Sequence, residues 1–81
     1  MIYVYKIIDP YTQKVVGEGG MNFMNRRTIA DAIRRQTGTV TKKGTAHVIQ
    51  VYRLVWELQD RVTGHPIYRV IVTENKYAEN A

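Results

Sequence analysis

The absence of cysteine is the feature that most limits how this chain can fold. Its 81 residues suffice for one domain, and a domain of this size buries only roughly 60% of the surface that the unfolded chain exposes. Disulfides and thiolate metal sites, which stabilise many small domains, are excluded. The fold must therefore depend on a well-packed core or on surface buried in an oligomer, and a homodimer is one such expectation.

We expect one domain over residues 1–76, followed by a C-terminal tail over residues 77–81. The apolar content of 44% is ordinary for a globular domain. Lys6 interrupts the longest nearly apolar stretch, residues 1–8, whereas a membrane-spanning helix needs about 20 apolar residues. The same stretch lacks the basic region and cleavage site of a signal peptide. The sequence therefore predicts a cytoplasmic protein without membrane contact.

The predicted elements begin with a hairpin. Residues 2–9 and 14–18 are rich in β-branched types, with aromatic residues in the first segment, and a turn that begins at Asp9 joins them. We expect Gly19 and Gly20 to end the second strand and to form a flexible joint before the helix.

A single helix is predicted over residues 26–37. Asn25 is a suitable N-cap, with Asn22 as an earlier alternative, and Gly38 is a favourable residue just beyond the last turn. The helical period separates a side that faces the core from a charged outer side. The first side holds Ile29, Ala32, Ile33 and Gln36, and the outer side holds Arg27, Asp31, Arg34 and Arg35.

Residues 46–58 fit both a helical and a strand period, and their β-branched content favours a strand. A turn over residues 60–64 and a strand over residues 66–74 follow, and the apolar faces of this last strand are typical of a central position. The predicted fold is α+β, in the order β-β-α-β-β, with a four-stranded, mainly antiparallel sheet and the amphipathic helix on one face. The alternative is a winged helix-turn-helix with a second helix at residues 45–58, against which Gly44 and the β-branched residues argue.

Two segments share an internal pattern in which an aromatic residue precedes Asp-x-x-Thr by four positions. They are Tyr5 with Asp9 and Thr12, and Trp56 with Asp60 and Thr63. An Asp that opens a type I turn, followed by Gly or a polar residue in the left-handed conformation, makes a compact hairpin loop. The sequence therefore predicts two similar hairpins on either side of the helix.

Six cations within eighteen residues form the main candidate site. They are Arg26, Arg27, Arg34, Arg35, Lys42 and Lys43, with Asp31 as the acid among them. Cations spaced along a helix and the loop after it can neutralise successive phosphates and release their counterions. With a net charge of +5, the chain is expected to bind nucleic acid, DNA rather than RNA. The alternative interpretation is a solvated helix face.

Eight aromatic rings, six of them tyrosine, form the second candidate. Exposed rings can stack on unpaired bases, although packing in the core and between strands is their commoner role. Tyr11, at the tip of the first predicted hairpin, is the ring that we expect to be exposed and available for stacking.

The sequence contains no arrangement typical of catalysis. His47 and His65 lie eighteen residues apart without a third ligand at a recognisable spacing, so no metal site is predicted. The glycines of residues 17–20 lack the Lys-Ser/Thr of a phosphate-binding loop and the spacing of a dinucleotide motif. We therefore expect neither a cofactor nor enzymatic activity.

The start of the chain resembles that of GIY-YIG nucleases, in which a hairpin carries two tyrosines and the next helix a catalytic arginine. The resemblance lies in Ile2 and Tyr3, then Val15, Val16 and Gly17, then Arg26 and Arg27. Met1 stands for the family's glycine, Val15 stands for the second tyrosine, and no downstream glutamate is identifiable as the metal ligand. The resemblance implies a shared local shape over the first third of the chain, and no nuclease activity follows from it.

In size and composition the chain also resembles the short basic proteins of bacteriophages and mobile elements. The sequence thus predicts a DNA-associated accessory protein from such a source. The alternative is a small protein–protein interaction module or inhibitor, whose contact would be an exposed strand edge or a Tyr/Trp patch.

Overall fold

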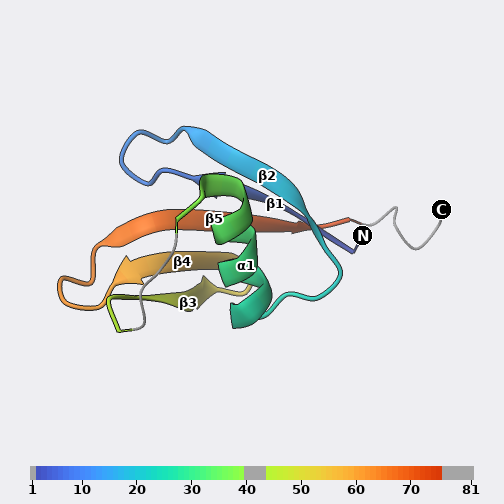
Figure 1. The fold of residues 1–81 in the computed structure, drawn as a ribbon. Coiled ribbons are helices and arrows are strands. Elements are labelled where there is room, and N and C mark those ends of the chain that lie inside the picture. Colours follow the sequence, from blue (N-terminus) through green and yellow to red (C-terminus); the bar gives the residue numbers. More distant parts are fainter. Residues whose placement is uncertain (1, 40–43, 76–81) are drawn as a thin grey trace.

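The computed structural model describes residues 2–39 and 44–75. Along this part of the chain lie the strands β1 (Tyr3–Ile8) and β2 (Val15–Met21), the helix α1 (Arg26–Thr37), and the strands β3 (Ala46–Tyr52), β4 (Val55–Asp60) and β5 (Pro66–Glu74). These five strands form one antiparallel sheet in the order β2-β1-β5-β4-β3, and α1 crosses one face of it (Figure 1). The predicted α+β class is confirmed, and the predicted central position of residues 66–74 corresponds to β5. The predicted tail, residues 77–81, lies outside the described residues.

The sheet has five strands, whereas four were predicted. Residues 46–58 belong to two strands, which a tight turn at Arg53 and Leu54 joins, so the described order is β-β-α-β-β-β. The turn contains no Gly, Pro, Asn, Asp or Ser, the residue types that usually indicate a turn, so it could not be recognised in the sequence. Neither turn residue has a positive φ, and the register of β3 against β4 shifts between Gln50 and Tyr52. Such a bulge accommodates a turn whose twist differs from that of the strands. The alternative with a helix at residues 45–58 is wrong.

The glycines of β2 have a packing role, and the prediction that they end the strand is wrong. A Cβ added to Gly19 would lie 2.6 Å from the Tyr5 hydroxyl oxygen. A Cβ added to Gly17 would lie 2.6 Å from the Cβ of Gln36 on α1. Both distances are shorter than real Cβ contacts, so the missing side chains let the Tyr5 ring and α1 approach β2 closely.

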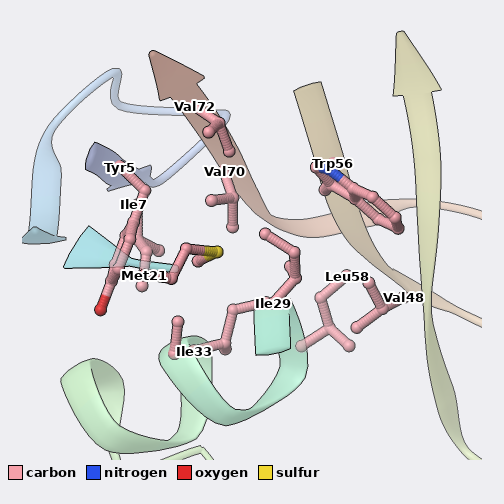
Figure 2. Close-up of a cluster of buried hydrophobic side chains, with 11 residues drawn as sticks. Tyr5, Ile7, Met21, Ile29, Ile33, Val48, Trp56, Leu58, Val70 and Val72 are labelled. Atoms are coloured by element: carbon pink, nitrogen blue, oxygen red, sulfur yellow. The ribbon is translucent and has the colours of Figure 1, made fainter. Parts of the chain in front are cut away.

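The core lies between α1 and the sheet. Ile29, Ala32 and Ile33 form the buried side of α1, as the helical period predicted, whereas Gln36, predicted on the same side, is exposed. Figure 2 shows that Ile29 extends from α1 toward Leu58 and Val70 of the sheet. The remaining members of this core are Tyr5, Ile7, Met21, Val48, Trp56 and Val72. Because buried residues alternate along β1 and β5, the opposite face of the sheet is not covered by α1.

Local sequence fixes both ends of α1 where they were predicted. Asn25 Oδ1 accepts a hydrogen bond from the Thr28 N–H at 2.9 Å, and Thr28 Oγ1 accepts one from the Asn25 N–H at 2.9 Å. This reciprocal pair is a capping box. Gly38 adopts the left-handed conformation with φ 72°, and its N–H donates to the Arg34 carbonyl at 2.9 Å. Within residues 2–39 and 44–75, no helix has the length and apolar character needed to cross a membrane.

The first predicted hairpin loop joins β1 to β2. Asp9 Oδ1 accepts hydrogen bonds from the N–H groups of Tyr11 and Thr12 at 2.8 and 3.2 Å. Thr12 Oγ1 accepts a third from the Lys14 N–H at 3.3 Å. Gln13 occupies the left-handed position with φ 63°, and it is the non-glycine residue with a positive φ among the described residues.

The second loop, between β4 and β5, repeats this network, as the internal pattern predicted. Asp60 Oδ1 accepts from the N–H groups of Val62 and Thr63 at 2.8 and 3.0 Å. Thr63 Oγ1 accepts from the His65 N–H at 3.2 Å. Here Gly64, with φ 75°, takes the left-handed position, which glycine adopts without steric cost.

Removing glycine from one left-handed position and introducing it at the other should change stability in opposite directions. Gly64→Ala is expected to lower the free energy of unfolding by about 1 kcal/mol, because a Cβ disfavours the left-handed conformation. Gln13→Gly is expected to raise it by a smaller amount, since the side-chain hydrogen bond from Gln13 to the Pro10 carbonyl is lost. Urea unfolding of both variants measures the two changes, and a neutral Gly64→Ala would show that a Cβ has no steric cost at this left-handed position.

The carboxylate of Asp60 should make stability depend on acid pH. Its pKa lies below the ordinary value, because the carboxylate accepts hydrogen bonds from the N–H groups of Thr63 and Val62. Because folding lowers this pKa, the ionised carboxylate stabilises the folded state at pH values above the unfolded-state pKa of ~3.9. This contribution disappears as the pH falls through the folded-state pKa. We expect the stability difference between the unmodified protein and Asp60→Asn to shrink between about pH 5 and about pH 2 in urea unfolding. A difference that stays constant over this range would rule out the effect.

Candidate nucleic-acid interface

The four predicted arginines of α1 are exposed to solvent. Arg27 and Arg34 lie on the side opposite the buried Ile29, and their seven-residue spacing separates them by about 10 Å along the helix axis. Arg26 and Arg35 are exposed on the flanks of this row. We call the surface formed by Arg26, Arg27, Arg34 and Arg35 the arginine surface.

Internal ion pairs neutralise little of the arginine surface. Arg34 Nη2 lies 3.2 Å from Asp31 Oδ1, and both side chains are largely exposed, so the pair contributes little to stability. Arg26, Arg27 and Arg35 form no ion pair within residues 2–39 and 44–75. The described part of α1 therefore presents four cations against one carboxylate.

Two arginines outside α1, Arg69 in β5 and Arg53 in the β3–β4 turn, are in contrast paired with carboxylates. Glu57 is only 7% exposed, and its Oε2 accepts a hydrogen bond from Arg69 Nε at 2.9 Å. Its Oε1 accepts one from Gln59 Nε2 at 2.8 Å. Arg53 pairs with Glu74. Carboxylates thus balance the charges of Arg53 and Arg69, whereas Arg26, Arg27 and Arg35 of α1 have no such partner among the described residues.

Arg26 and Arg27 occupy positions that do not favour the helix. They are the first two residues of α1, whose first turn contains no acid. The helix dipole places partial positive charge at this end, so a cation there costs about 0.3–1 kcal/mol. Arg34 and Arg35 lie in the last turn, where the same dipole favours cations. Helix stability therefore accounts for the second arginine pair and not for the first.

Among the described residues, the aromatic rings range from buried to exposed, with Tyr3 and Tyr68 partly buried. Tyr5 and Trp56 belong to the core, as packing predicted, so these rings do not form a stacking platform on the sheet. Tyr11 lies at the tip of the β1–β2 loop and is 69% exposed. Tyr52 and Phe23 are 72% and 73% exposed, and the sequence analysis singled out neither. Phe23 lies between β2 and the N-cap of α1, so it belongs neither to the strand period nor to the helical period of apolar residues. This position is the one sequence signal that could have indicated its exposure.

Two predicted members of the site, Lys42 and Lys43, lie outside the described residues. In the described part of the chain, no three side chains among His, Asp and Glu lie close enough to hold a metal ion. A cleft of about 220 Å³ lies between α1 and the strands β3 and β4, and it is smaller than the pockets that hold most small-molecule ligands. Its lining residues are Ala30, Asp31, Ile33, Arg34, Thr39, Val48 and Leu58.

Comparison with protein-family models, with curated protein sequences and with solved structures finds no match to this chain. A function must therefore be argued from the charges and exposed side chains of this chain alone. The arginine surface and the exposed rings of Phe23, Tyr11 and Tyr52 are the surface features of the described residues that could contact a ligand.

Replacing Arg26 and Arg27 together by glutamate should stabilise the protein. The change removes two cations from the positive end of α1 and introduces two anions there, so we expect the free energy of unfolding to rise by about 1 kcal/mol. Thermal unfolding measures the gain as a higher Tm. Arg34→Glu is the matched control, since it breaks the pair with Asp31 and places an anion in the last turn, and it should lower Tm. A lower Tm for the first variant would show that these arginines support the fold.

Proposed function

We propose that this protein binds nucleic acid, preferentially DNA, through the arginine surface, and that it acts as an accessory protein and not as an enzyme. The observation that supports the proposal is the contrast in pairing: Arg53 in the β3–β4 turn and Arg69 in β5 are bound to carboxylates, while three of the four arginines on α1 have no ion-pair partner among the described residues. The predicted Lys42 and Lys43 would extend the same cationic segment along the chain.

Guanidinium groups suit this role for two reasons. Each one that meets a phosphate releases condensed counterions, and its planar donors can bind a phosphate with two hydrogen bonds. Contacts of this kind position a protein on the backbone and carry no sequence information. We therefore propose binding that depends strongly on salt and little on base sequence.

Binding of fluorescently labelled DNA and RNA at two salt concentrations tests the proposal. With four phosphate contacts on duplex DNA, the logarithm of the association constant should fall by about 3.6 per tenfold rise in salt. A fourfold increase in salt should then weaken binding about a hundredfold. Arg26→Glu with Arg27→Glu should weaken binding at least about tenfold and reduce the slope by about two, although the same variant is expected to be more stable.

A control with the same net charge separates the arginine surface from a general charge effect. Lys14 and Arg61 are exposed in the two hairpin loops, away from α1. Lys14→Glu with Arg61→Glu should retain most of the affinity of the unmodified protein. Equal losses in the two double variants would contradict a site on α1, and an unmodified protein that binds neither DNA nor RNA would refute the proposed function.

The second candidate function is protein binding, which the face of the sheet opposite α1 favours. Val4 and Ile71 are each 39% exposed there, and they border a shallow hollow of about 530 Å³. Lys6, Glu18 and Thr73 also line this hollow. We propose a homodimer or another protein partner at this face as the alternative. Size-exclusion chromatography with light scattering tests the homodimer, which Ile71→Lys should dissociate.

A further inference from the structure

Phe23 is turned toward solvent in a segment whose apolar neighbours are turned inward. Its side chain is 73% exposed. Met21, two positions earlier, is buried in the core, and Met24, the next residue, packs against it. The chain between β2 and α1 is therefore anchored on both sides of Phe23, and the ring has no packing partner in the core.

The exposed ring precedes, by three residues, the arginine pair that helix stability does not explain. Phe23 precedes Arg26 by three positions, so their Cα atoms are at most about 11 Å apart. Asn25, between them, forms the capping box of α1 and fixes the direction in which the helix starts. Two cations at the positive end of a helix are unfavourable for folding, and the exposed ring, which occurs within five residues of them, contributes nothing to the core. Departures from local stability of this kind are expected where a segment has a function.

We infer that Phe23 stacks on an unpaired base while Arg26 and Arg27 bind the neighbouring phosphates. This inference rests on the proposed function and deepens it, because it assigns single-stranded DNA as the preferred ligand. A ring without a polar group offers a base only its face, and the faces of bases inside a duplex are already covered by their neighbours. Tyr11, the ring predicted for stacking, lies beyond the opposite end of β2, so it does not take part in this contact.

Fluorescence anisotropy with a labelled single strand and with a labelled duplex of the same sequence tests the inference at one low salt concentration. Phe23→Ala should weaken binding of the single strand at least about fivefold, since loss of one stacked base has an effect of this size. Binding of the duplex should change less than about twofold. Phe23→Tyr, which keeps the ring, should bind the single strand as the unmodified protein does. Thermal unfolding of Phe23→Ala should give an unchanged Tm, because the ring is not part of the core.

Tyr52→Ala is the matched control. Tyr52 is 72% exposed and pairs in register with Val55, whose neighbour Trp56 faces α1, so Tyr52 lies on the opposite face of the sheet. This variant should bind both ligands normally. The inference is overturned if Phe23→Ala binds the single strand with full affinity, if it loses affinity for both ligands equally, or if Tyr52→Ala has the same effect. An unmodified protein that binds neither ligand would instead refute the proposed function itself.

Discussion

The packing of one helix on one face of the sheet determines most of this structure. The chain has no cysteine, so the contact of Ile29, Ala32 and Ile33 with the sheet must supply much of its stability. The same helical period decides what α1 shows to solvent. Because the apolar residues recur every three to four positions and face inward, Arg27 and Arg34 necessarily face outward. The core and the arginine surface are thus two consequences of one pattern.

Two glycines of β2 allow close approaches that a side chain would block. Gly17 leaves room for Gln36 of α1, and Gly19 leaves room for the Tyr5 ring. The placement of α1 also affects charge, because Arg26, Arg27 and Arg35 form no ion pair with a carboxylate of the described residues. Glu57 is committed to Arg69 and Gln59 inside the sheet, so it is not available to neutralise the arginine surface.

Features that depend on local chemistry could be predicted from the sequence, and features that depend on distant contacts could not. The ends of α1 follow from Asn25 and Gly38, and the two hairpin loops follow from the Asp-x-x-Thr pattern. The turn at Arg53 and Leu54 has no such local signature and is held by neighbouring strands, with the Leu54 carbonyl accepting from the Val72 N–H at 2.8 Å. The role of the glycines in β2 was missed for the same reason. For the candidate site, the period predicted exposed arginines, whereas the absence of ion pairs at Arg26, Arg27 and Arg35 among the described residues depends on where remote carboxylates lie.

The most informative feature of the candidate site is the difference between its two arginine pairs. Arg34 and Arg35 are placed where the helix dipole favours cations, so their presence needs no function. Arg26 and Arg27 are placed where it disfavours them, and no carboxylate of the described residues compensates. A ligand with negative charge would reverse this balance, because it would benefit from both guanidinium groups and from the dipole at the same end of α1. The start of the helix is therefore better suited to a polyanionic partner than the cationic segment as a whole, and Phe23, with its exposed ring, precedes that start by three residues.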